Sequence, residues 1–154
     1  MKLAEALALR AEMQNKVSKL RERLGKCALV QEGDKSPEDP QKLLAECGGV
    51  ITDLYALVAR INRTNATVKL ADGRTMLDVI AERDRLKQQI ALTTFAASAT
   101  VPIAELNRYS PREIKWVAKL DAAVLHKQTD DLSSKLRELN GKIQEANWAL
   151  SLGP

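Results

Sequence analysis

Apolar residues recur at intervals of three and four along four long stretches of this chain, and polar connections separate the stretches. That spacing places the apolar side chains on one face of an α-helix. We expect helices over residues 2–26, 40–61, 76–99 and 122–150. The pattern therefore predicts a mainly α protein, a bundle of long antiparallel helices forming one domain over residues 1–154.

The first expected helix carries a single apolar stripe that one arginine interrupts. The stripe consists of Leu3, Leu7, Met13, Val17, Leu20 and Leu24. Arg10 falls on the same line. Such an arginine either lies at the flank of the seam with its aliphatic stem against it, or is buried in an ion pair that sets the register.

The second expected helix begins at Asp39-Pro40, because Asp is a favoured N-cap and Pro fits the first helical position. Its broad apolar face comprises Leu43, Leu44, Cys47, Val50, Ile51, Leu54, Val58 and Ile61. Gly48-Gly49 in the middle costs roughly 1 kcal/mol per glycine relative to alanine, so we expect either close approach of another helix or a kink there. Tyr55 and Leu57 fall off this face and are candidates for a second contact surface.

The stretch from Ile61 to Asp84 interrupts the helical pattern. A run of Asn, Arg and Thr over residues 62–65 predicts a helix end, because Asn and Thr side chains compete for backbone hydrogen bonds. Residues 67–70 then read as a short strand, and Asp72-Gly73 predicts a chain reversal. Thr75, with Asp78 three residues later, is a helix N-cap signature, so the third helix begins at Met76.

A second strand is expected over residues 113–120. Ser110-Pro111-Arg112-Glu113 is itself a helix-start signature, but the residues after it alternate apolar and charged side chains with a period of two. We therefore expect a turn followed by a strand that pairs with residues 67–70. The two would form a small sheet at one end of the bundle.

The last two helices are predicted from longer seams. The third places Leu77, Ile80, Leu86 and Ile90 toward the core. The fourth holds a near-heptad seam typical of coiled coils, formed by Leu125, Leu132, Leu136, Leu139, Ile143, Ala146 and Leu150. His126 and Asp130 lie one turn apart on its expected exposed side.

Polar residues of the central stretch form the candidate site. Its members are Asn62, Arg63, Asn65, Arg74, Arg83 and Asp84. One interpretation is that they satisfy backbone groups in a helix–hairpin–helix connection. The other is that they converge on a pocket for an anion or a partner. An anion would suit the start of the third helix, where the helix dipole favours negative charge.

Composition favours self-association over catalysis. Aromatic residues make up 3% of the 154 residues and charged residues 29%, a mix typical of helices that pack through aliphatic seams. Long thin helices bury little surface alone, so we expect a homo-oligomer, a dimer or a higher assembly such as a hexamer. No Ser-His-Asp set, phosphate-binding glycine loop or dinucleotide motif is present, so no catalytic residue is predicted.

The charge is mildly basic, with a formal net charge of +4. One local excess lies near the end of the first helix, at Lys16, Lys19, Arg21, Arg23 and Lys26. It either complements the negative end of the helix dipole or binds phosphate, which keeps nucleic acid as a less favoured partner.

Cysteine, histidine and hydropathy patterns limit the other possibilities. Cys27 and Cys47 lack metal-ligand spacing and there is one histidine, so we expect reduced thiols, no metal and no cofactor. Charged residues interrupt any leader sequence, and the longest uncharged run, residues 90–104, is too short and too polar to cross a membrane. These features predict a cytoplasmic protein.

Several motifs together resemble a known group of sequences. They are MKLAEAL, VQEGD, PEDP, INRTN, LADGRT, AERD, RYSPREIKW and IQEANW, in that order over nearly the whole chain. They are similar to those of an uncharacterised bacterial family often labelled septicolysin-like. The resemblance implies a mainly helical cytoplasmic homo-oligomer without agreed catalytic residues. The label suggests a cytolysin, which the lack of a leader and of a membrane-competent segment argues against.

Three functions follow in order of preference. The first is a non-enzymatic helical homo-oligomer in the bacterial cytoplasm that serves as a scaffold or binding module. The second is a protein that binds a small anionic ligand or nucleotide, with or without catalysis, through the central Asn/Arg/Asp cluster. The third is nucleic-acid binding through the basic cluster of the first helix.

Overall fold

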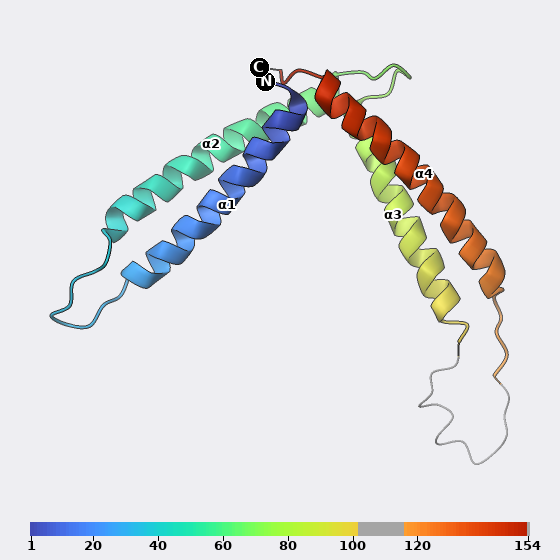
Figure 1. Cartoon of the computed structure of the whole chain (residues 1–154), viewed down its shortest axis with the longest axis horizontal. Coiled ribbons are helices and arrows are strands. Elements are labelled where there is room, and N and C mark those ends of the chain that lie inside the picture. The colour runs from blue at the N-terminus through green and yellow to red at the C-terminus, as the bar shows by residue number, and fades with distance from the viewer. Residues whose placement is uncertain (102–115, 154) are drawn as a thin grey trace, which may run out of the picture. The chain divides into compact units, whose positions relative to one another are not determined.

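The computed structural model describes residues 1–101 and 116–153, and these residues are all-α (Figure 1). Four helices are found there: α1 (Leu3–Cys27), α2 (Pro40–Thr67), α3 (Met76–Ser98) and α4 (Ala122–Ala149). The mainly α prediction is confirmed. Three helices begin and end within one residue of their predicted bounds, and α2 runs six residues further than its predicted end at residue 61.

The chain divides into two compact units. Unit 1 comprises Met1–Met76 with Gln144–Pro154, and unit 2 comprises Leu77–Ile143. Each is described by itself below. The prediction of a single domain stays a prediction.

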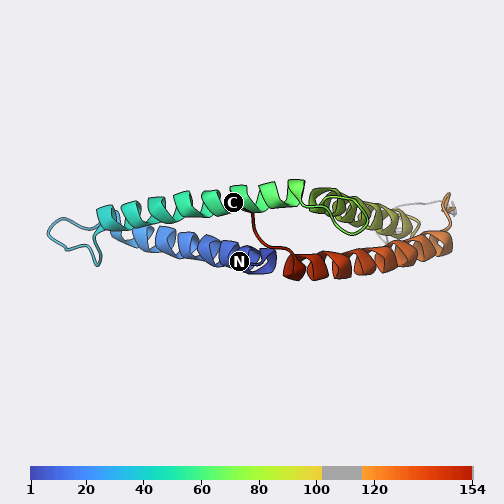
Figure 2. The ribbon, with the colours of Figure 1, turned by 90° about the horizontal axis from the view of Figure 1, so that it is seen from above.

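In unit 1, α1 and α2 lie side by side and antiparallel, as both ribbon views show (Figures 1 and 2). The buried residues of α1 are Leu3, Ala6, Leu20 and Cys27, and those of α2 are Leu43, Cys47, Leu54, Leu57, Ile61 and Thr64. Neighbouring positions in each set are three, four, seven or fourteen residues apart, all close to whole numbers of helical turns, which keeps one side of each helix turned toward the other. Both cysteines are buried free thiols in this core.

Arg10 lies in the α1 seam and is half-buried. Its Nε is buried and has no hydrogen-bond partner among the described residues. A half-buried side chain with a buried Nε fits the flank interpretation, in which the aliphatic stem packs against the seam and the guanidinium tip reaches water.

Asp39 begins α2 as predicted. Its Oδ1 accepts hydrogen bonds from the backbone N of Gln41 (2.9 Å) and of Lys42 (3.3 Å), and Pro40 occupies the first helical position. Glu38, one residue earlier, forms an ion pair with Arg23 of α1. The connection between the helices is thus fixed at the point where α2 begins.

The two ends of the described chain pair with each other in unit 1. Lys2 and Ser151 form an isolated antiparallel bridge. The backbone N of Leu3 donates to the carbonyl O of Leu150, and the N of Leu152 donates to the O of Met1, both at 2.9 Å. This terminal bridge joins the start of α1 to the segment that follows α4.

The predicted strand at residues 67–70 is wrong, because α2 continues to Thr67. The hydroxyl of Thr64 donates to the carbonyl O of Arg60 (2.9 Å), and that of Thr67 donates to the O of Arg63 (2.8 Å). Both threonines therefore bond back along the helix and do not end it.

The reversal at Asp72-Gly73 is confirmed, with Gly73 at φ 83°. The N of Leu70 donates to the O of Arg74 (2.8 Å), and one isolated bridge joins Lys69 to Thr75. The turn holds a single bridge and no strand.

The predicted strand at residues 113–120 is also wrong where the structure describes it. Residues 116–120 form no strand or helix, and Trp116 and Val117 are 59% and 68% exposed. Residues 113–115 lie outside the described part of the chain. Alternating side chains stabilise a strand only when one face is buried and a neighbour pairs with it. The expected neighbour, residues 67–70, belongs to a helix end and a turn.

In unit 2, α3 and α4 are joined by a hydrogen bond between the hydroxyls of Thr93 and Thr129 (2.7 Å). Leu86 is buried as predicted, but Leu77 is 54% exposed and Val79 is buried in its place. The buried residues of α4 in this unit, Leu139 and Ile143, belong to the predicted seam.

Candidate functional site

The last two turns of α2 carry three of the six predicted site residues. Asn62 and Arg63 are exposed and Asn65 is half-buried. They lie on a helix and not in a loop, because α2 extends past them. A helix C-terminus carries partial negative charge, which disfavours an anion there.

Thr64 lies between those residues and holds the segment that follows α4. It is 2% exposed, and its Oγ1 accepts a hydrogen bond from the backbone N of Gly153 (3.0 Å). One turn earlier, the Nε of Arg60 donates to the carbonyl O of Gly153 (3.1 Å). Sequence reasoning missed both residues. The signal was spacing, because Leu57, Ile61 and Thr64 continue the buried seam.

Asn65 has a buried Oδ1 with no hydrogen-bond partner among the described residues. A buried acceptor left unpaired costs roughly 1–3 kcal/mol. The unpaired atom is an acceptor, so it would suit a hydrogen-bond donor better than an anion.

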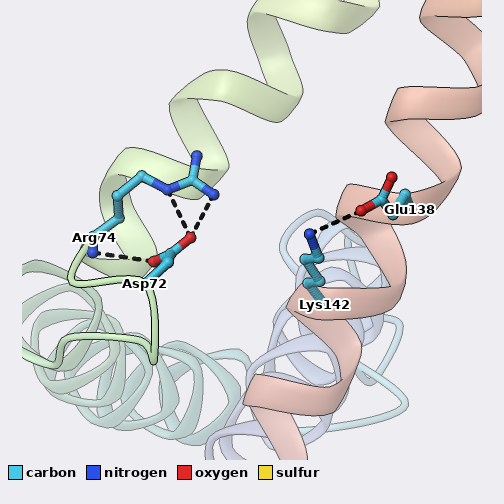
Figure 3. Close-up of polar contacts among 4 residues, drawn as sticks. All are labelled: Asp72, Arg74, Glu138 and Lys142. Atoms are coloured by element: carbon cyan, nitrogen blue, oxygen red, sulfur yellow. Dashed lines mark hydrogen bonds and ion pairs between the residues drawn. The ribbon is translucent and has the colours of Figure 1, made fainter.

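Arg74 is engaged within its own turn (Figure 3). Its Nε and Nη2 donate to the Oδ2 of Asp72 at 2.9 and 2.6 Å, and its backbone N donates to the Oδ1 at 3.1 Å. The pair closes the reversal at Gly73 and neutralises the guanidinium charge.

Arg83 and Asp84 belong to α3 in unit 2. The Nε of Arg83 lies 2.9 Å from the Oδ1 of Asp84, so these neighbours form an ion pair with each other. The six predicted residues are therefore divided between two units. The structure brings Asn62, Arg63 and Asn65 together on one helix end, and a common pocket for all six stays a prediction.

The basic cluster of α1 is largely paired with acids. Lys16 contacts Glu46 of α2 (3.1 Å), Lys26 contacts Glu22 (2.7 Å), and Arg23 contacts Glu38. The hydrogen bond from Lys26 lowers the pKa of Glu22, and the one from Arg23 lowers the pKa of Glu38. This compensation leaves less positive charge available for a phosphate backbone than the sequence suggests.

A groove of about 370 Å³ lies between α3 and α4 in unit 2. It is lined by Gln89, Leu92, Thr93, Gln128, Asp131, Leu132 and Lys135. None of the six predicted residues lines it. His126 lies on α4 and is exposed, and within the described ranges no three His, Cys, Asp or Glu side chains gather to hold a metal ion.

A second apolar line runs along α2, outside the core. Leu44, Ile51 and Tyr55 are 56%, 39% and 66% exposed, and Val58 is half-buried. Leu44 and Ile51 belong to the predicted broad apolar face, but they are not part of the buried core. Tyr55 is exposed as a second contact surface requires, whereas Leu57 is buried. One neighbouring helix covers only one side of α2, and the predicted face was wider than that.

Gly48 and Gly49 interrupt this apolar line, and the space beside each is open among the described residues. A Cβ added at Gly48 or Gly49 would meet no atom within 4 Å. Close approach of another described part of the chain therefore does not explain either glycine.

The fold and site define an all-α protein of paired long helices, whose apolar surface is only partly covered in the described residues. The chain belongs to a family of unknown function, DUF6847, whose model matches residues 10–152. It is similar to a functionally unknown conserved protein from Corynebacterium diphtheriae, known from a crystal structure. That likeness has 38% sequence identity and a TM-score of 0.90, and covers 99% of each chain.

No curated protein matches the chain. Neither match carries a septicolysin-like label. Among the described helices, none has the length and hydropathy that crossing a membrane requires.

Proposed function

We propose that this protein is a non-enzymatic, helical homo-oligomer of the bacterial cytoplasm that acts as a scaffold or binding module. The observation that carries this proposal is the exposure of large apolar side chains on the helices. Tyr55, Leu92 and Phe95 are 66%, 66% and 70% exposed. Large apolar side chains exposed on helices are typical of protein–protein contacts.

The use of charge supports the same proposal. Arg74, Arg83 and Arg85 each pair with a carboxylate on a nearby residue of the chain. Short-range pairs of this kind are typical of solvated helix surfaces, whereas a catalytic site needs groups from several elements aimed at one point.

Sedimentation velocity over a range of protein concentrations tests the proposal. We expect a dimer or a higher assembly, such as a hexamer, in equilibrium with a small monomer fraction. A single monomeric species at every concentration would overturn the proposal.

A second candidate is a small anionic ligand or nucleotide bound by the central cluster. Arg63 favours it, because its side chain is exposed beside Asn62. Calorimetric titration with inorganic phosphate and with ATP tests it, with Arg63→Glu as the variant that should lose binding. Heat that is unchanged in this variant would count against the site.

Two further predictions rank below these two candidate functions. Nucleic-acid binding would need the α1 cations freed from Glu22, Glu38 and Glu46. The septicolysin-like assignment rests on motif resemblance alone.

A further inference from the structure

We propose that a second copy of this chain docks antiparallel on the outer stripe of α2, with Tyr55 of each copy over Gly48 of the other. The outer stripe consists of Leu44, Gly48, Ile51, Tyr55 and Val58. The inference rests on the proposed function, because it assigns a surface and a symmetry to the self-association proposed above.

The outer stripe has the spacing of a helix–helix seam. Its members follow one another at intervals of four, three, four and three residues. The same intervals occur one residue earlier in Leu43, Cys47, Val50, Leu54 and Leu57, which pack against α1 or lie buried. Two seams therefore run in parallel along α2, and α1 covers the first.

The outer stripe is complementary to itself when reversed. In an antiparallel pair with a two-fold axis at Ile51, Leu44 faces Val58 and Gly48 faces Tyr55 of the second copy, while Ile51 meets its own equivalent. Tyr55 of each copy, the largest side chain of the stripe, thus faces Gly48 of the other copy, which has no side chain. A two-fold interface requires this kind of self-complementarity.

Gly48 gains a purpose in this arrangement. Glycine inside a helix is destabilising relative to alanine, and no other described part of the chain lies within 4 Å of the position that a Cβ at Gly48 would take. The open space above Gly48 would receive the ring of Tyr55, which is 66% exposed in the single chain.

Charge favours the same pairing. Between residues 43 and 59 the charged residues are Glu46 and Asp53. Each lies two positions from a stripe residue, about 160° away around the helix, since successive residues turn by about 100°. On that other side of the helix, Glu46 forms an ion pair with Lys16 of α1. The stripe is therefore uncharged although the chain carries a net charge of +4.

The ends of α2 carry opposite charges. Asp39 caps the start of the helix, and Arg63 is exposed near its end. An antiparallel pair brings Asp39 of one copy near Arg63 of the other and opposes the two helix dipoles. Both effects favour the antiparallel over the parallel arrangement.

A charge-swap experiment tests the proposal on the whole chain. Ile51→Lys places two lysines at the two-fold axis, and Ile51→Glu places two glutamates there. We expect each variant alone to associate roughly 10-fold or more weakly than the unmodified chain, because like charges face each other. An equimolar mixture of the two variants should recover association, because Lys then faces Glu.

Sedimentation velocity gives the association constants, and circular dichroism checks that each variant stays helical. Leu29→Lys, in the connection after α1, where the side chain is 88% exposed, is the matched control and should associate as the unmodified chain does. Gly48→Leu fills the space for Tyr55 and should also weaken association.

The outcomes separate the two proposals. If the unmodified chain associates and both Ile51 variants associate equally well, the outer stripe is not the interface, and the proposed function stands. If both variants dissociate but their mixture does not recover, the two-fold arrangement is overturned. If the unmodified chain is monomeric, the proposed function itself fails.

Discussion

Two faces of α2 carry the same repeat and meet different surroundings. The inner seam, represented by Leu43, Cys47 and Leu54, is 4–6% exposed, whereas Leu44 and Tyr55 of the outer stripe are 56% and 66% exposed. Apolar spacing alone does not distinguish the two faces, because each recurs every three or four residues. The difference teaches that the repeat marks both faces as apolar, and that among the described residues α1 packs on one of them.

The largest expected effect on stability is the difference between Leu54 of the inner seam and the adjacent Tyr55 of the outer stripe. Leu54→Ala should lower the free energy of unfolding by about 2–5 kcal/mol, because it opens a cavity in the seam against α1. Tyr55→Ala should change it by less than about 0.5 kcal/mol in the monomer, because the ring is exposed. Urea denaturation at low protein concentration measures both. Equal losses for the two variants would mean that the faces do not differ.

The next largest effect on stability is expected at Thr64, at the end of the inner seam. Thr64→Val removes the acceptor for the Gly153 backbone N and should cost about 1–2 kcal/mol, since a part-buried donor is left unpaired. Hydrogen exchange should show faster exchange at Gly153. Thr67→Val is the control, because its hydroxyl donates to Arg63 O at an exposed position. Unchanged exchange at Gly153 would contradict the role of Thr64.

Replacing the glycines of α2 should raise the free energy of unfolding, whereas the preceding variants lower it. Gly49→Ala should raise the free energy of unfolding by about 0.5–1 kcal/mol, because a Cβ meets open space and helix propensity improves. Gly48→Ala should give the same gain in the monomer but also weaken association, because it fills the space for Tyr55. Thermal unfolding measures the stability of the two variants, and sedimentation velocity measures their association. Identical behaviour of the two variants would argue against the special role of Gly48.

The smallest expected effect concerns pH. The folded pKa values of Glu22 and Glu38 are lowered from 4.5 by hydrogen bonds from Lys26 and Arg23. The unfolded chain therefore takes up these protons first. The stabilisation is fully present above pH 4.5 and is lost as pH falls through the lower folded values. Both carboxylates are exposed, so the slope should be shallow. Glu38→Gln should flatten it further in acid titration followed by circular dichroism.

Sequence patterns predicted most of the helix bounds because local chemistry decides them. Asp39 and Pro40 begin α2, and Gly73 forms the reversal before α3. The end of α2 could not be predicted, since Thr64 and Thr67 hydroxyls can either compete with the helix or bond back along it. Thr64 also accepts a hydrogen bond from the backbone N of Gly153, a contact with a residue distant in sequence.

The candidate site was less predictable than the fold. Polarity drew attention to Asn62, Arg63 and Arg74, but ion pairs such as that of Arg74 with Asp72 appear only in three dimensions. Of the outer stripe, the sequence marked Tyr55 as a second contact surface but did not separate Leu44 and Ile51 from the inner seam. Leu44 and Ile51 fit one wide apolar face equally well until the position of α1 is known.

The terminal bridge constrains the order in which the protein can be assembled during synthesis. Leu3 bonds to Leu150, 147 residues later, so this contact forms only after residue 150 has left the ribosome. The seam between α1 and α2 joins residues much closer in sequence, and its loop-closure cost is lower. A nascent chain should therefore acquire the helical pair early and close its ends last.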